Sequence, residues 1–364
     1  MTPTVARHQI HVHHHGGDTD RLLVDAVRPL LLDLDRLGCR PWFVRHWRRG
    51  PHVRLVVRAD ESTLRERVLP AVGAHLDGPL AARSVTRVDL DAVLPLHRRL
   101  AELELDDGPL TPWHPDNSWH VEPYDDRLAV HGTAEASQLT ADFLHETNMH
   151  AFTLVGEALA RGDGGRRAAV FDIMVLLADR LAVGGLPLGH LSYRSHAQAY
   201  LAQAPDGDRR RRTWDDYHRS HGGELSDRID ALLGPTGDAH PAHAFVSAVG
   251  RYQEWGRNLW HRGLLPLGDD EQAEPDRVAA MAGLSPFHQA LVGNDTWWNG
   301  VRTSAEFAGY RLALNLMYLQ FTRAGLVPEH RYLLCHLVAR TVESRTGRDA
   351  VDVVRAFGDG TVPG

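Results

Sequence analysis

Histidine is the residue type whose spacing first suggests chemistry in this 364-residue sequence. Four histidines, His11 and His13 to His15, follow one another near the N-terminus. The alternation of a β-strand would put His11 and His13 on one face, where they could bind a metal ion. No acidic residue or cysteine lies near them in the sequence, and the polar face of a strand explains them equally well. No metal site is therefore predicted.

A second pair of histidines, His145 and His150, lies in a stretch with helical periodicity. A zinc-binding helix places two histidines four residues apart so that they share a face. A spacing of five separates the two imidazoles by about 140° around the helix axis. The simpler interpretation is two surface histidines.

The charged residues exclude several classes of function. All 40 basic residues are arginine, so the chain has no lysine for a Schiff base, a Walker motif or a kinase site. The formal net charge of −7 argues against a nucleic-acid partner. The sequence shows no secretory signal, no apolar run of membrane-spanning length and only two cysteines, Cys39 and Cys335. We therefore expect a cytoplasmic protein without a membrane partner or a cofactor.

The elements that must position any site divide into two parts of a single domain, residues 1–136 and 137–364. The first part contains strands at 9–15, 41–47 and 52–58 and helices at 18–37 and 64–76, because apolar residues alternate in the strands and recur at helical spacing in the helices. This order predicts a split β-α-β, ferredoxin-like sheet unit. The basic run Arg209–Arg212 is assigned to a loop.

The second part is predicted to be mainly helical, with helices at 140–159, 168–181, 240–262, 303–324 and 329–344 and loops near 161–166, 204–208 and 234–240. Thr303 and Glu306 have the spacing of a capping box, and Gly325 and Pro328 end that helix. The fold class is therefore α+β, with the sheet unit packed against a helical C-terminal part.

Three segments together resemble a known family. They are Trp42–Trp47 with Gly50–Val57, then Trp119–Arg127, and finally Leu312–Leu333. In this order they are similar to the C-terminal elimination domain of lantibiotic dehydratases and its stand-alone relatives in thiopeptide biosynthesis. The family domain removes glutamate from glutamylated serine or threonine and leaves a dehydroamino acid.

The sequence departs from the family pattern at residues that this elimination needs. Arg54 and Arg127 match two arginines of the pattern, but a further arginine falls on Val56, and the family histidine falls on Tyr318. A phenol is a poor general base at neutral pH, although it is a good hydrogen-bond donor. The site therefore looks re-purposed, as in the thiopeptide pyridine synthases of the same family.

The resemblance to that branch implies an enzyme that acts on a modified precursor peptide carrying a leader. A pyridine synthase joins two dehydroalanines of a linear, azole-containing peptide in a formal [4+2] aza-cycloaddition. Loss of water and of the leader then leaves a pyridine in a macrocycle. Such a site must hold two alkenes together, convert an amide to its iminol form and relay protons.

The candidate catalytic residues are Tyr318 as donor, Tyr310 eight residues earlier, and Ser285 and Asp295 as members of a proton relay. Tyr318 and Tyr310 could instead be core or surface residues of an amphipathic helix, and Ser285 a turn or cap residue. The candidate substrate-binding residues are polar or aromatic side chains on the predicted rim and strand: Gln320, His288, Trp297, Trp298, His52, Arg54 and Arg127. The segments around 284–288 and 294–299 are expected to be loops that meet the azoles by stacking.

Two other functions stay open on the sequence alone. One is glutamate elimination within a split dehydratase, with His288 replacing the missing base. The other is a non-catalytic peptide-binding partner, which the loss of charged family residues would permit. The sequence also leaves open whether the protein works as a homodimer or within a biosynthetic complex.

Overall fold

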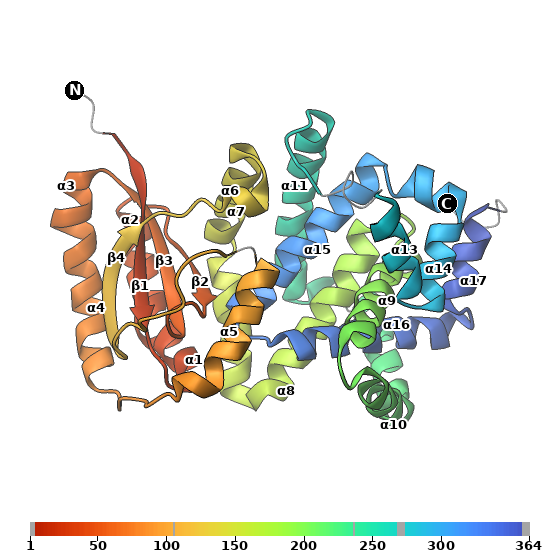
Figure 1. Cartoon of the computed structure of the whole chain (residues 1–364), viewed down its shortest axis with the longest axis horizontal. Coiled ribbons are helices and arrows are strands. Elements are labelled where there is room, and N and C mark those ends of the chain that lie inside the picture. Colours follow the sequence, from red (N-terminus) through yellow and green to blue (C-terminus); the bar gives the residue numbers. More distant parts are fainter. Residues whose placement is uncertain (1–3, 105, 236, 268–273, 359–364) are drawn as a thin grey trace. The chain divides into compact units, whose positions relative to one another are not determined.

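The computed structural model describes residues 4–104, 106–235, 237–267 and 274–358 (Figure 1). The chain forms two compact units, the first of residues 1–163 and 322–325 and the second of residues 164–321 and 326–364. The first unit holds a four-stranded sheet, and the described elements of the second are all helical. The predicted α+β class is confirmed. None of the described helices is long and apolar enough to cross a membrane.

The first unit begins with the predicted alternation of strands and helices. Its elements are β1 (Ala6–His13), a continuous helix of α1 (Thr19–Leu22), η1 (Leu23–Val27) and α2 (Arg28–Arg36), β2 (Trp42–His46), β3 (His52–Ala59), a second continuous helix of α3 (Glu61–Thr63), η2 (Leu64–Val68) and α4 (Leu69–Ala81), then α5 (Leu90–Glu104), β4 (Ser118–Pro123), α6 (Leu128–His131), α7 (Ala134–Glu146) and the first half of α8 (Asn148–Leu181). Helix α7 and the start of α8 belong here because they pack on the sheet, with Phe152 stacked on Phe43 of β2.

The second unit contains the remaining helices. They are the rest of α8, α9 (Leu186–Gln203), α10 (Gly207–Leu233), η3 (Gly237–Ala239), α11 (Ala242–His261), α13 (Pro275–Gly283), α14 (Pro286–Gly293), η4 (Thr296–Val301), α15 (Ala305–Arg323), α16 (Pro328–Thr346), α17 (Ala350–Arg355) and η5 (Ala356–Gly358). The final turn of α15 reaches the first unit at Thr322 and Arg323.

The sheet has the order β2-β3-β1-β4, and all its described pairs are antiparallel. This is the predicted split β-α-β arrangement, since β3 lies between β1 and β2. Period-two alternation gives the sheet two unlike faces. One is apolar, with Ile10, Val12 and Leu55 fully buried. The other carries histidines, because His11 lies opposite Arg54 on β3 and His120 on β4.

Several predicted boundaries change for local reasons. Arg209–Arg212 is not in a loop, because it forms the first turns of α10, where Arg210 pairs with Asp206 at 2.6 Å. The helix predicted at 140–159 is broken at Thr147, between α7 and α8. The loop predicted at 161–166 is a kink in α8 at Gly162, whose φ is 67°. Helix α15 begins at Ala305, and Ser304, in place of Thr303, accepts the capping hydrogen bond from Phe307 N.

The segment from 284 to 301 is helical, where loops were predicted. Ser285 caps α14 by accepting a hydrogen bond from His288 N, and η4 follows after Asn294. Asn294 Oδ1 accepts from Trp297 N and starts that turn. Short polar residues that look like loop signals act here as caps between consecutive short helices.

Candidate functional site

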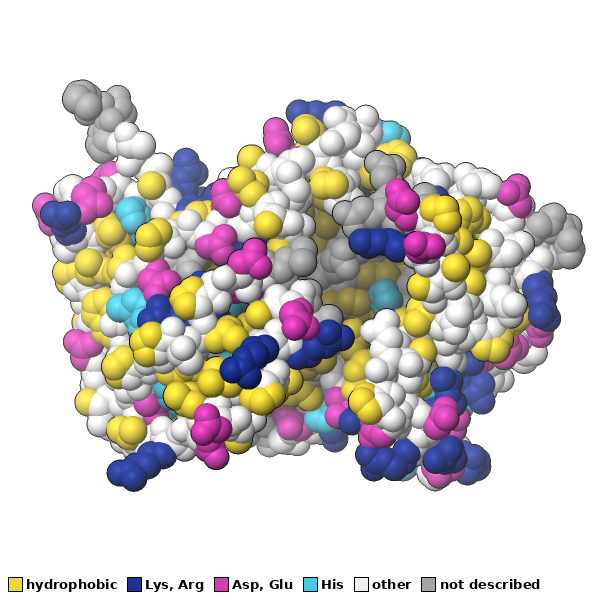
Figure 2. Space-filling model, in the orientation of Figure 1, with side chains coloured by type: hydrophobic (Ala, Val, Ile, Leu, Met, Phe, Trp, Pro, Cys, Tyr) yellow, Lys and Arg dark blue, Asp and Glu magenta, His cyan; other side chains and the backbone are white. Residues whose placement is uncertain are grey.

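The second unit encloses a cavity of about 820 Å³. Figure 2 shows this part of the surface hollowed, with hydrophobic side chains on the floor of the hollow. Its volume lies in the range of small-molecule and cofactor sites. The apolar lining comes from α9, α14, η4 and α15, and includes Leu188, Leu191, Phe287, Leu291, Trp297, Phe307 and Leu314. Its polar lining includes Ser192, Ser195, His196, Tyr310 and Asn315.

Helix α9 can form one wall because it packs closely on α8. A Cβ at Gly189 would lie 2.8 Å from Ala182 Cβ and 2.9 Å from the Ala178 carbonyl oxygen. Only glycine permits this approach without a shift of one helix. The hydroxyl of Tyr310 on α15 donates to the Gly189 carbonyl oxygen at 3.1 Å and joins the two cavity walls. Burial raises the pKa of Tyr310, so its hydroxyl stays protonated at neutral pH.

A chain of three hydrogen-bonded side chains begins at Ser195 on the cavity wall. Its Oγ lies 2.9 Å from Nε2 of His288, and Nδ1 of the same ring lies 2.9 Å from Ser285 Oγ. His288 is 2% exposed, and burial lowers its pKa to about 4. The imidazole is therefore neutral at neutral pH, with one nitrogen as donor and one as acceptor. Such a ring can pass a proton between the two serines.

A second chain begins at His196, the next residue of α9. Its Nδ1 lies 2.9 Å from the hydroxyl of Tyr318, and that hydroxyl lies 3.4 Å from Cys335 Sγ. Burial, followed by the nearby Arg331 charge, lowers the pKa of His196 to about 4. Burial and the adjacent Cys335 raise the pKa of Tyr318 well above its ordinary value. Both groups are neutral at neutral pH, so they can donate and accept without carrying charge.

The structure places the other candidates of the second unit at different distances from the cavity. Trp297 lines it and packs edge-on against Phe307. Trp298 lies outside the described lining, with the Arg302 guanidinium 4.5 Å above its ring. Asp295 is exposed and accepts from Asn299 Nδ2 at 2.5 Å. Tyr318 and Gln320 are also outside the described lining, and Gln320 is fully buried.

The remaining candidates, His52, Arg54 and Arg127, belong to the first unit. Arg54 is buried on the histidine face of the sheet, where it donates to His52 Nε2 at 3.3 Å. Burial lowers the pKa of Arg54 to about 10, which leaves it charged at neutral pH. Among the described residues no carboxylate lies within salt-bridge distance of its guanidinium. Arg127 lies 3.8 Å from Asp106.

The family is decided by comparison with known proteins. The model for the C-terminal domain of lantibiotic biosynthesis dehydratases matches residues 8–342. The chain belongs to this family. The solved structure of TbtD, a pyridine synthase from thiomuracin biosynthesis, is 32% identical, with a TM-score of 0.75, and the match covers 94% of this chain and 99% of TbtD. The structure of TsrL is 20% identical, covers 97% of this chain and 99% of TsrL, and has a TM-score of 0.70, which shows a shared fold.

The family resemblance predicted from the three segments is thereby confirmed. Comparison with curated proteins gave no match. The cavity of this dehydratase C-terminal family member lies entirely in the second unit, whereas the arginines that match the family pattern lie in the first.

Sequence reasoning missed Ser195 and His196, which carry the polar wall of the cavity. Helix α9 was not predicted, so neither residue could be assigned to a secondary-structure element. A signal was present in the spacing of Leu188, Leu191, Ser192 and Ser195, which is that of one helix face. Two serines that continue an apolar stripe indicate a buried helix face, and their hydroxyls need hydrogen-bond partners there.

The buried histidines of the second unit predict a loss of stability in acid. His190 and His288 are both fully buried, and burial lowers the pKa of each to about 4. An unfolded histidine has a pKa of about 6.5, so the unfolded chain binds more protons below that pH. The free energy of unfolding should fall between about pH 6.5 and pH 4, by roughly 2 kcal/mol per histidine from pH 7 to pH 5.

Urea denaturation of the wild type and a His190→Gln variant at the two pH values measures this effect. The variant should lose less stability than the wild type over the same interval, because one of the histidines with a lowered pKa has been removed. An identical loss in both proteins would contradict the assignment of a depressed pKa to His190.

Proposed function

We propose that the protein is a pyridine synthase of thiopeptide biosynthesis that acts on a dehydrated, azole-containing precursor peptide with a leader. The observation that carries the proposal is the cavity, whose apolar wall is interrupted by the ends of two buried, neutral hydrogen-bonded chains. The 32% identity to TbtD over nearly the whole of both chains supports it.

The proposed reaction is redox-neutral and balances without a further reactant. The amide before one dehydroalanine tautomerises to an iminol and completes a 2-azadiene. One new bond joins the two methylene carbons, and the other joins the iminol carbon to the α-carbon of the second dehydroalanine. Each ring methylene then gives up one proton, the iminol oxygen leaves as water, and the leader leaves as a carboxamide.

The cavity wall supplies what the first step requires. With the Tyr318 hydroxyl donating to Nδ1 of His196, the Nε2–H of His196 is the donor that remains for the amide. Ser195, whose hydroxyl is backed by His288, is the matching acceptor for the amide proton. Tyr318 is then a positioning residue that fixes the His196 tautomer, and Ser285 extends the relay behind His288.

The apolar lining has a separate part in the rate. Trp297, Phe287 and Phe307 offer aromatic surfaces on which azole rings can stack. Holding the two alkenes in contact lowers the barrier by roughly 7–11 kcal/mol at best, because the entropy of bringing them together is lost on binding. If positioning supplies most of the rate acceleration, the site needs an apolar cavity of matching shape more than it needs charged residues.

The test is mass spectrometry of the purified protein with a leader-bearing azole peptide that carries two dehydroalanines. A macrocycle that has lost water and the leader is the expected product. The two alternatives give other results. Glutamate elimination would leave this peptide unchanged and would convert a glutamylated peptide to the dehydro form. A non-catalytic partner would bind both peptides and change neither mass, and either outcome would overturn the proposal.

A further inference from the structure

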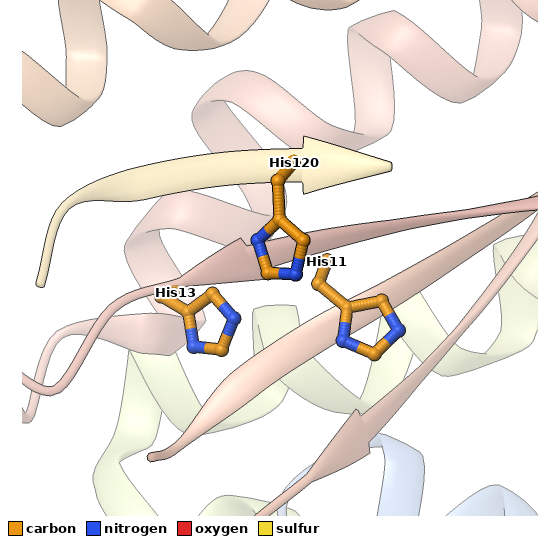
Figure 3. Close-up of side chains that lie close together, drawn as sticks. All are labelled: His11, His13 and His120. Atoms are coloured by element: carbon orange, nitrogen blue, oxygen red, sulfur yellow. The ribbon is translucent and has the colours of Figure 1, made fainter. Parts of the chain in front are cut away.

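We propose that the histidine face of the sheet is a transition-metal site, in which His11, His13 and His120 bind one Zn²⁺ ion. The three side chains come from β1 and from β4, which pair directly along this face. Their ligand atoms lie within 4.8 Å of one another. Figure 3 shows the three rings presenting ring nitrogens to the space between them. The inference concerns the first unit and does not depend on the reaction proposed for the second.

The spacing is close to that of a zinc site. Nitrogen ligands at about 2.0–2.1 Å from a tetrahedral zinc lie about 3.4 Å apart. Small rotations about χ1 and χ2 of the three histidines would bring their nitrogens to that distance. Three histidines with a fourth position for water or a carboxylate form a known type of zinc ligand set.

The burial of His13 on this face has no explanation unless its ring binds a ligand. Its side chain is fully buried, and neither ring nitrogen has a hydrogen-bond partner among the described residues. Its ring is packed against other imidazoles, with ring centroids 4.7 Å from His52, 4.5 Å from His114 and 5.2 Å from His120. A buried polar group with no partner costs free energy. A metal bond to His13 removes that cost.

The chemistry of the His13 ring also suits a cation. Neutral imidazole, with a free lone pair on one ring nitrogen, is the form that binds metal. His13 can offer that nitrogen without giving up a hydrogen bond, because neither of its ring nitrogens has a partner among the described residues.

Glu122 supplies the outer support that histidine ligands usually have. Its Oε1 lies 2.9 Å from Nε2 of His120 and accepts that N–H, which leaves the lone pair on Nδ1. Its Oε2 lies 3.7 Å from Nε2 of His11. Gln9 Nε2 lies 2.5 Å from the same nitrogen of His11. A flip of the Gln9 amide places its oxygen there, where it can accept a hydrogen bond from His11.

The expected consequence is that the ion ties β4 to β1. Strand β4 is at the edge of the sheet, so it is held on one side by backbone pairing with β1 alone. The overlapping group of His114, His120 and Glu122 shares His120 with the proposed site, and therefore competes with it for the same ligand.

The experiment uses the full chain with any affinity tag removed, stripped of metal and titrated with Zn²⁺ by calorimetry in the presence of a competing chelator. One Zn²⁺ should bind per chain. His120→Gln should weaken binding by about 100-fold or more, and Glu122→Gln by about 10–100-fold. His8→Gln is the matched control. His8 also lies on β1, but strand alternation puts its side chain on the opposite face of the sheet, so this variant should bind Zn²⁺ as the wild type does.

Co²⁺ in place of Zn²⁺ gives a second readout, the visible absorption of a tetrahedral site, which should be lost in His120→Gln. Circular dichroism of each metal-free variant establishes that it is folded. If His120→Gln does not fold, Glu122→Gln and the Co²⁺ spectrum of the wild type decide the question. No Zn²⁺ binding by the wild type, or equal binding by all variants, would overturn the proposal.

Discussion

Replacing His196 by phenylalanine should reduce kcat for macrocycle formation by about 100- to 10,000-fold, the usual contribution of a positioned acid–base group. The variant keeps the ring volume on the cavity wall but removes both the Nε2–H donor and the Nδ1 atom that contacts Tyr318. Binding of the dehydrated peptide should stay within about threefold of the wild type, because the apolar lining is unchanged. Single-turnover kinetics followed by mass spectrometry, together with peptide titration, measure both quantities.

A double-mutant cycle separates the role of Tyr318 from that of His196. Tyr318→Phe alone should reduce kcat by about 10- to 100-fold, because His196 loses the bond that fixes its tautomer. In the His196→Phe background the same change should have almost no effect, since there is no imidazole left to position. Tyr200→Phe is the control on α9, because Tyr200 stacks on Tyr332 and lies outside the described cavity lining. Additive losses would contradict a positioning role.

Replacing Arg323 by leucine should lower the free energy of unfolding by about 3–5 kcal/mol. Arg323 is fully buried in the first unit, and it donates to the Leu144 carbonyl oxygen at 2.8 Å and to Asn148 Oδ1 at 2.5 Å. Its guanidinium also lies 4.4 Å above the ring of Phe43. Leucine would leave these acceptors buried without their donor, and that desolvation cost is the main term. Urea or guanidinium denaturation measures the loss.

Arg161→Leu is the matched control for this prediction. Arg161 is exposed on α8 and pairs with Glu157 four residues earlier, so its loss should cost less than about 1 kcal/mol. Equal effects of the two substitutions would mean that the Arg323 hydrogen bonds do not hold the end of α15 to the first unit. The family segment around Arg323 would then need an explanation other than stability.

The sequence predicted β1, β2 and β3 well because their signals are local, whereas β4 was not predicted. Alternating apolar residues and the turn residues Gly50 and Pro51 define β2 and β3, and Gly38, with a φ of 78°, ends α2 as predicted. The C-terminal end of α15 was also predicted, from Gly325 and Pro328, whereas its N-terminal cap is Ser304 and not the predicted Thr303. Helix α9 was not predicted, because its apolar stripe is shared with serines, and tertiary packing around Gly189 decides where it lies.

The candidate sites were harder to predict, because both depend on pairing between distant residues. His11 and His13 seemed to lack further ligands, since none is near them in the sequence. The register of β1 with β4 brings His120 beside them and Glu122 next to that histidine, from more than a hundred residues away. The expectation of no metal site considered only residues near His11 and His13 in the sequence, whereas the register of the sheet brings distant residues beside them.

The cavity shows the same limit. Tyr310 and Trp297 were predicted to meet the substrate, and both line the described cavity, whereas Tyr318 approaches it only through His196. A helical period can say which residues share a face of α15, but it cannot say which helix covers that face. The roles of Tyr310, Ser285, Asp295 and the other candidates remain predictions.

The most direct measurement is the accurate mass of the released leader, quantified together with the macrocycle in one time course. Leader and macrocycle should appear in a one-to-one ratio. The leader should carry a C-terminal carboxamide, because the bond broken is between its nitrogen and the α-carbon of the second dehydroalanine. A leader with a carboxylic acid end would indicate hydrolysis. That result, or an intact peptide, would contradict the assignment of pyridine formation to this cavity.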